Sequence, residues 1–319
     1  MGISIDLVVK WYCVCDIFVK DRLGKEFWLI EGINYMISTI KYNLDLGGGS
    51  LMQIANRSLS QMMSYIIDCP NGNVIVIDGG MYCEEDAKNL YNELEKRGKK
   101  VALWFFTHCH VDHYGAFLYL AEQKEFDIKI DKLCFHFPSR DWLLTKEDKQ
   151  YTEKFFSFMD NSSFSIVTPK YNDVFSCGGI QIEILNEPCN YENYPTINPT
   201  GIILKVHFPK RAVLFLGDFD VYGEEEYRNN FSIEKLRCDI VQMSHHGQNG
   251  ASREFYELIQ PKYCLYTAPD WLWENNFYGC NEPNTRGKGN FTTLETRRWM
   301  AELNVIRSFH LGEGDWIFS

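Results

Sequence analysis

Three strongly apolar segments of this chain run directly into histidine and aspartate side chains. They are FFTHCHVDH at 105–113, LFLGDFD at 214–220 and VQMSHHG at 241–247. A single histidine at a strand end is usually solvated or structural, but imidazole and carboxylate together are the donors that suit zinc, manganese or iron. Because α/β sheets present ligands at the carboxyl ends of their strands, the sequence predicts that the three segments meet at one edge and bind metal.

Hydrophobic patterning predicts alternating strands and helices around these segments. Residues 62–69 and 73–80 are apolar, partly β-branched runs on either side of a PNGN turn, so we expect an antiparallel hairpin. A helix is expected over 84–100 and a buried strand over 101–107, which places the first histidine cluster at a strand end. Later segments repeat this alternation, and two sheets faced by helices satisfy the order. The predicted class is therefore α/β, or α+β.

A run of three glycines in LDLGGGSL, at 44–51, is the best candidate for a linker. We therefore predict an N-terminal extension over 1–50 and a main domain over 51–319. The extension would be either an extra element packed on the main domain or a separate accessory segment.

Composition limits which binding partners and which cellular compartment we expect. The formal net charge is −11, so no global positive field attracts nucleic acid, and long DNA or RNA is disfavoured as a partner. The eleven cysteines include no CxxC pair, which indicates reduced thiols in a cytoplasmic protein. No apolar run approaches the roughly 18 to 20 residues of a membrane span, so no membrane association is expected. Nothing in the composition indicates the oligomeric state.

The three endings resemble the motifs of the metallo-β-lactamase-fold hydrolases. They match a His-x-His-x-Asp-His signature, a bridging aspartate and a late histidine: His108, His110, Asp112 and His113; Asp218; and His245. The order from GDF through a helix to DIVQMSHHG most resembles the branch that includes the hydrolase domain of DNA-uptake competence proteins. The resemblance covers residues 51–319. It implies a four-layer αββα sandwich with metals held between the sheets at one edge.

The resemblance implies two divalent metal ions, with zinc expected and manganese or iron as alternatives. His108 and His110 alternate along an extended segment and can therefore bind the first ion together. The remaining assigned ligands are Asp112, His113 and His245 at the second ion and Asp218 between the two. Two ions about 3.5–4 Å apart can share a hydroxide and make it a nucleophile near neutral pH.

Other residues would support the ions or the reaction. Asp112 would also act in catalysis, by orienting or deprotonating the attacking water. His246 would face the substrate and protonate a leaving group or bind a phosphate, or in an alternative interpretation it takes the ligand position of His245. Asp78 matches a family aspartate that holds a ligand histidine by its free N–H.

The sequence departs from the family pattern in one interval. Many relatives supply a further histidine to the first ion between the first motif and the bridging aspartate, but here that interval contains only His136 and His207. We interpret both as structural. In the competence-type pattern Asn198 occupies the place of that histidine and Thr200 follows it, so both are expected beside the first ion. The first ion is therefore expected to be weakly bound or absent.

These features predict a metal-dependent hydrolase acting on a phosphoester or phosphodiester in a small or short substrate. The same metal core could attack a carbonyl carbon, which leaves lactone, thioester and amide hydrolases as alternatives. A di-iron redox protein and a binding module without catalysis are alternatives from other classes. Metal content and a phosphodiester assay would separate these classes.

Overall fold

The computed structural model describes residues 17–20, 26–29, 39–146, 149–188 and 190–319. The chain divides into two compact units, Met1–Met36 and Ile37–Ser319. In the smaller unit, strands β1 (Ile17–Lys20) and β2 (Glu26–Leu29) pair antiparallel. No helix in the described part of the chain is long and apolar enough to cross a membrane.

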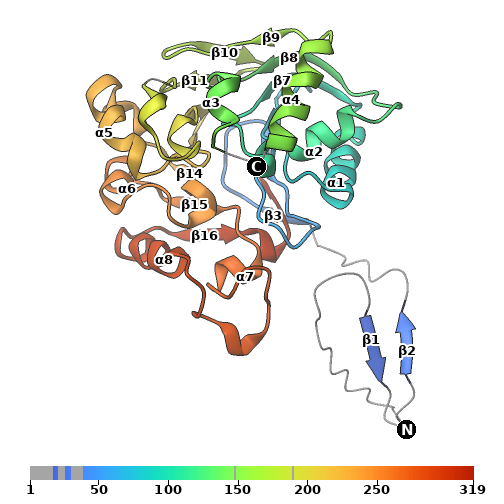
Figure 1. Cartoon of the computed structure of the whole chain (residues 1–319). Coiled ribbons are helices and arrows are strands. Elements are labelled where there is room, and N and C mark those ends of the chain that lie inside the picture. Colours follow the sequence, from blue (N-terminus) through green and yellow to red (C-terminus); the bar gives the residue numbers. More distant parts are fainter. Residues whose placement is uncertain (1–16, 21–25, 30–38, 147–148, 189) are drawn as a thin grey trace. The chain divides into compact units, whose positions relative to one another are not determined.

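An eight-stranded mixed sheet forms one half of the larger unit (Figure 1), with the order β3-β17-β4-β5-β6-β7-β8-β9. The strands are β3 (Thr39–Tyr42), β4 (Ser50–Gln53), β5 (Tyr65–Asp68), β6 (Val74–Ile77), β7 (Lys100–Phe105), β8 (Lys129–Cys134), β9 (Ile166–Val167) and β17 (Asp315–Phe318). β5 and β6 form the predicted antiparallel hairpin. β6, β7 and β8 run parallel, so their carboxyl ends lie at one edge.

A seven-stranded sheet forms the other half, with the order β10-β11-β12-β13-β14-β15-β16. Its strands are β10 (Val174–Cys177), β11 (Ile180–Ile184), β12 (Leu204–His207), β13 (Ala212–Phe215), β14 (Ile240–Gln242), β15 (Tyr263–Tyr266) and β16 (Arg307–His310). β13 to β16 are parallel, and again their carboxyl ends share an edge.

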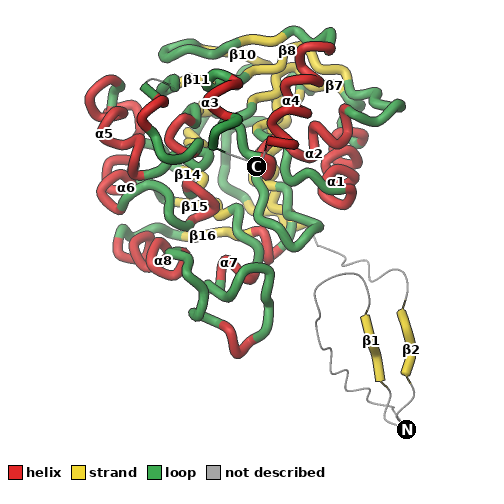
Figure 2. The backbone as a smooth tube through the Cα atoms, in the orientation of Figure 1, coloured by secondary structure: helices red, strands yellow, loops and turns green. Residues whose placement is uncertain are grey.

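Helices cover the outer faces of both sheets (Figure 2). They are α1 (Glu84–Glu95), α2 (Val111–Ala121), α3 (Arg140–Leu143), α4 (Lys149–Asn161), α5 (Val221–Asn230), α6 (Arg253–Ile259), α7 (Asp270–Trp273) and α8 (Thr293–Glu302). α1, α2 and α4 pack on the eight-stranded sheet, and α5, α6 and α8 pack on the seven-stranded sheet. The predicted αββα sandwich is confirmed.

Three apolar layers hold this sandwich together. Along β7, Phe105 faces the opposite sheet while its neighbour Trp104 faces the helices, as the two-residue period of a strand requires. Along β13, Phe215 and Leu214 divide in the same way. All four side chains are fully buried, and each contributes about 1.5–3 kcal/mol by leaving water. Burial on both faces explains why the segments before the metal-capable residues are continuously apolar.

The larger unit begins before the glycine run. β3 pairs parallel with β17, so residues 39–42 belong to the eight-stranded sheet. Leu44 and Leu46 are buried in the layer between the sheets. Gly47 and Gly49 adopt positive φ in the turn that leads into β4, a conformation that glycine tolerates best. Residues 39–50 therefore form part of the main domain, whereas a separate role for the preceding residues stays a prediction.

Candidate metal centre

The metal-capable residues follow strands that are neighbours in the two sheets. β6 leads into Asp78 and β7 into the first histidine cluster, while β13 leads into Asp218 and β14 into the histidine pair at 245–246. Backbone hydrogen bonds join the first histidine cluster to the segment before β12, and the histidine pair to the residue before Asp218. Ile202 N donates to Thr107 O over 2.9 Å, and His245 N donates to Gly217 O over 3.0 Å. The three apolar segments therefore meet at one edge of the sandwich.

The first donor group consists of His108, His110 and Asp218, whose ligand atoms lie within 4.8 Å of one another. His108 Nε2 is 2.9 Å from His110 Nδ1 and 3.7 Å from Asp218 Oδ2. His108 and Asp218 are buried, whereas His110 is half-buried. One face of this group is therefore closer to solvent.

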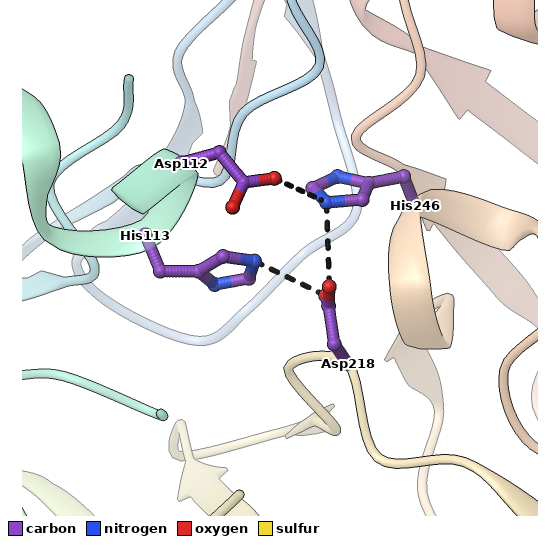
Figure 3. A group of neighbouring side chains, drawn as sticks. All are labelled: Asp112, His113, Asp218 and His246. Atoms are coloured by element: carbon purple, nitrogen blue, oxygen red, sulfur yellow. Dashed lines mark ion pairs between the residues drawn. The ribbon is translucent and has the colours of Figure 1, made fainter. Parts of the chain in front are cut away.

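The second donor group consists of Asp112, His113, Asp218 and His246, all of them buried (Figure 3). His113 Nε2 lies 3.1 Å from Asp218 Oδ1, and His246 Nε2 lies 3.0 Å from Asp112 Oδ2. Asp218 Oδ2 is 3.6 Å from His246 Nε2 as well as near His108. The Asp218 carboxylate thus belongs to both groups, at the position predicted for a bridging ligand.

The local backbone of the first motif changes from extended to helical within the motif. α2 begins at Val111, so Asp112 and His113 lie in its first helical turn, and His110 is the N-cap with extended φ and ψ of −109° and 145°. Gly115 lets α2 pack closely on the preceding segment, because a Cβ there would collide with the backbone of Tyr82. A carboxylate in the first turn is also favoured by the helix dipole.

Hydrogen bonds to the outer nitrogens orient the histidines. His113 Nδ1 is 2.6 Å from Asp78 Oδ2, and His108 Nδ1 is 3.1 Å from Thr107 Oγ1. Since Thr107 Oγ1 donates to Asp78 Oδ2 over 2.8 Å, it is free to accept the His108 proton. His246 Nδ1 lies 2.8 Å from Thr267 Oγ1. In each ring Nδ1 is engaged outward, so Nε2 is the nitrogen that faces the donor groups.

The charges of the site favour cations. Burial disfavours a protonated His113, but Asp218, Asp78 and Asp112 outweigh it and raise its pKa well above the ordinary value. For His246, burial is likewise outweighed by Asp218 and Asp112, and its pKa rises to about 9. Burial lowers the pKa of His108 well below the ordinary value, helped by His113, and keeps that ring neutral. Two carboxylates of the second donor group thus attract positive charge into a buried site.

The polar atoms at the centre of the site are better placed to bind metal ions than to form hydrogen bonds with one another. Within the described residues, His113 Nε2, Asp218 Oδ1 and His246 Nε2 are buried and make no aligned hydrogen bond, although each lies about 3 Å from an opposite charge. Donor atoms gathered this closely, without aligned hydrogen bonds to one another, are available to a metal ion. Nitrogen and carboxylate donors in this number suit zinc, manganese or iron. The residues present therefore fit a pair of divalent ions.

His245 lies beside the two donor groups but outside both. Its Nε2 is 3.8 Å from Asp218 Oδ2, and its side chain is 21% exposed. The structure thus gathers His246, and not His245, with Asp112 and His113. The ligand assignment of His245 to the second ion stays a prediction, and the geometry favours the alternative interpretation in which His246 takes that place.

Asn198 and Thr200 lie in a buried 3₁₀ turn, Asn198–Thr200, that precedes the segment next to His108. Thr200 Oγ1 donates to Ile197 O over 2.7 Å. Asn198 Oδ1 is buried and makes no hydrogen bond within the part of the chain that is described. At Gly201 an added Cβ would lie 3.7 Å from His108 Cβ, so the turn adjoins the first donor group.

The two histidines of the intervening segment make their contacts elsewhere. His136 Nδ1 is 2.9 Å from Pro169 O, and His207 Nε2 is 3.3 Å from Glu183 Oε2. Neither belongs to a donor group among the described residues. This placement agrees with their structural interpretation.

Sequence reasoning missed Thr107 and Gln61. Thr107 joins Asp78 to His108, and its only signal was a hydroxyl directly before the first histidine. Gln61 Nε2 lies 3.5 Å from Asp112 Oδ2, and Gln248 Nε2 donates to Gln61 Oε1 over 3.3 Å. Because Gln61 comes from the loop between β4 and β5, no local pattern could have linked it to Asp112.

The aromatic loop after β15 packs mainly against the body of the protein. Trp271 is buried, and its Nε1 donates to Leu59 O over 2.7 Å. Trp273 stacks on His310 with ring centroids 4.3 Å apart. Phe277 and Tyr278 remain exposed. The two tryptophans are therefore structural, and only the tip of the loop offers free aromatic surface.

Comparisons with known proteins add a family and a fold. The family model described as Metallo-beta-lactamase superfamily matches residues 59–263. No curated protein matches the chain. CmlA, a diiron beta-hydroxylase from Streptomyces venezuelae, is similar in structure with a TM-score of 0.52 and 12% identity over 83% of this chain and 53% of that chain. For the metallo-beta-lactamase fold protein YhfI from Bacillus subtilis the TM-score is 0.49 at 9% identity, over 85% of this chain and 99% of that chain. The chain spans about half the length of CmlA, and the likeness shows the fold alone.

Proposed function

This chain belongs to the metallo-beta-lactamase superfamily, and from this premise we propose that it is a metal-dependent hydrolase. The bond it cleaves is proposed to be a phosphoester or phosphodiester in a small or short substrate. The observation that carries the proposal is the Asp218 carboxylate, which two donor groups share at the meeting edge of the sheets.

The chain's own residues would divide the work around the ions. Two divalent ions, zinc first among the candidates, would polarise a water molecule and the scissile bond. Asp112 sits at the rim of the buried cluster, where Gln61 and His246 contact its carboxylate, and its proposed role is to orient or deprotonate the attacking water. Asp78 and Thr107 orient the rings of His113 and His108 through their Nδ1 atoms. Orientation and proton transfer thus come from the protein.

The choice of bond and substrate rests on two features of the sequence. The order of the late motifs resembles the competence-protein hydrolase branch, which favours phosphodiester chemistry. The net charge of −11 disfavours a long polyanion, since such a partner needs an extended basic surface. We propose a cytoplasmic location because the cysteines of the described residues are free thiols.

Metal analysis with a hydrolysis panel tests this function. We expect two equivalents of zinc or manganese in the purified protein, with turnover of bis(p-nitrophenyl) phosphate. Turnover only of lactones, thioesters or amides would contradict the proposed phosphoester bond but would still support a hydrolase. Bound iron with a visible absorbance band and no hydrolysis would favour a redox protein, and no bound metal would favour a binding module. His207→Ala is the control, because this histidine contacts Glu183 instead of a donor group and should keep both metal and turnover.

A further inference from the structure

We propose that His245 is a third nitrogen ligand of the first donor group, so that the adjacent histidines His245 and His246 bind different ions. This inference rests on the proposed metal-dependent function. It changes the predicted assignment, in which His245 serves the second ion. It also supplies the donor that the interval between the first motif and Asp218 lacks.

The backbone turns the two histidines apart. His245 and His246 have φ and ψ of 49° and 50° and of 58° and 15°, two consecutive left-handed conformations that non-glycine residues rarely adopt. Their ring centroids are 6.0 Å apart and their planes differ by 54°. Such strain persists only where the surroundings fix it, and it is concentrated at functional sites.

Hydrogen bonds hold the strained turn in place. Ser244 N donates to the Tyr256 hydroxyl over 3.0 Å, and Gln248 N donates to His245 O over 2.9 Å. The bond from His245 N to Gly217 O ties the turn to the residue before Asp218. His245 is therefore carried on a rigid turn attached directly to the loop of the bridging aspartate.

His245 is oriented in the same way as the other candidate ligands. Its Nδ1 lies 3.4 Å from Asn249 O, so the Nδ1 proton points to a carbonyl and the Nε2 lone pair points inward. The Nε2 atoms of His245, His246 and His108 lie at similar distances from Asp218 Oδ2, namely 3.8, 3.6 and 3.7 Å. His136 and His207 instead contact Pro169 O and Glu183 Oε2.

The number of donors decides which ion His245 serves. The second donor group has four donors, which completes the coordination that zinc prefers, whereas the first donor group has three. His246 Nε2 turns toward Asp112 in the second group, 3.0 Å away. His245 Nε2 instead lies near Asp218 Oδ2, the oxygen that is also 3.7 Å from His108 Nε2 of the first group. Its partly exposed ring can adjust its χ angles to join His108 and His110.

Metal stoichiometry of paired variants tests this assignment. Each variant is loaded with Zn²⁺, dialysed and analysed by mass spectrometry, and circular dichroism checks its fold. We expect His245→Ala and His110→Ala each to retain one equivalent, and the double variant His110→Ala/His245→Ala to retain one as well, since both residues serve the same ion. The double variant His245→Ala/His246→Ala should lose both equivalents.

The opposite pattern would overturn the inference. If His245 serves the second ion, His110→Ala/His245→Ala loses both equivalents and His245→Ala/His246→Ala keeps one. If His245→Ala keeps two equivalents while Asn198→Ala loses one, Asn198 is the missing donor instead. His245→Gly, which tolerates a positive φ, repeats the test if the alanine variant fails to fold. A wild-type protein that retains no zinc, manganese or iron would refute the proposed function itself, whereas two equivalents insensitive to His245 would refute only the inference.

Discussion

The two donor groups share Asp218 but differ in their surroundings. The second donor group has four ligand atoms on buried residues, and its outer bonds run to Asp78 and Thr267. The first donor group has three, and His110 is half-buried. A buried site releases its ion slowly, whereas a site open to water exchanges more readily. The difference indicates that the second ion is the permanent one and that the first is the more weakly held.

The two groups also differ in charge. Asp112 belongs to the second donor group alone, and together with Asp218 it keeps protons on His113 and His246. In the first donor group His108 stays neutral because burial and the neighbouring His113 lower its pKa. A metal ion that binds the second group must therefore displace protons from His113 and His246. At the first group the ion binds a His108 ring that is already neutral. Three experiments test how far this contrast holds.

Replacing the shared carboxylate should have the largest effect, because it acts on both groups at once. We expect Asp218→Asn to lose both metal equivalents and to lower kcat/KM by about 10³-fold or more, since bound metal contributes several kcal/mol to the transition state. Mass spectrometry gives the metal content, and the phosphodiester assay gives the rate. If one equivalent remained in full, the two groups would be independent and Asp218 would not bridge them.

Asp220→Asn is the matched control for that substitution. Asp220 is buried two residues further on, and its Oδ1 accepts a hydrogen bond from Tyr222 N as the N-cap of α5. Asparagine caps helices about as well as aspartate, so stability should change by less than about 1 kcal/mol. Both metals should remain. Loss of metal in this variant as well would mean that the charge of the whole loop matters and not the Asp218 ligand.

Much of this arrangement was predictable from local sequence. The apolar strands and their polar ends follow from burial on both faces, as Trp104 and Phe105 show, and the carboxyl-end rule then brings Asp218 to the first histidine cluster. The hairpin of β5 and β6 also followed from its turn residues. Periodicity and strand direction are local properties, and they suffice to place a site at an edge.

The details that sequence left open depend on contacts between distant segments. The left-handed backbone of His245 and His246 and the packing of their turn decide which of the two enters the second donor group. No hydrophobic periodicity in the sequence predicts such a turn. The close packing of α2 depends on the approach of Gly115 to Tyr82. β3 joins the sheet by pairing with β17 at the other end of the chain, a partner that no local signal identifies.

Removing the Thr107 hydroxyl should weaken the first ion's binding more than the second's. Thr107 Oγ1 lies 3.1 Å from His108 Nδ1, while His113 keeps its own bond to Asp78 of 2.6 Å. We therefore expect Thr107→Val to weaken binding of the first ion by about 10–100-fold and to affect the second much less. Competition with a chromophoric chelator measures both affinities. Thr107→Ser keeps the hydroxyl and should restore them, and equal weakening of both ions in the valine variant would contradict the contrast.

The last expected contrast is a difference in pH dependence between the two ions. The pKa of His246 is raised to about 9, so below that pH a proton must leave before the second ion binds. Because the raised pKa of His113 requires a second proton to leave, affinity for the second ion should rise by between about tenfold and about a hundredfold per pH unit between about pH 7 and 9. The first ion should show a flatter profile, because the lowered pKa of His108 leaves its ring already neutral in this range. Chelator competition at each pH, together with calorimetry in buffers of different ionisation enthalpy, measures the proton released with each ion. Equal proton release at both sites would show that the two groups titrate as one unit, and the electrostatic part of the contrast would then be lost.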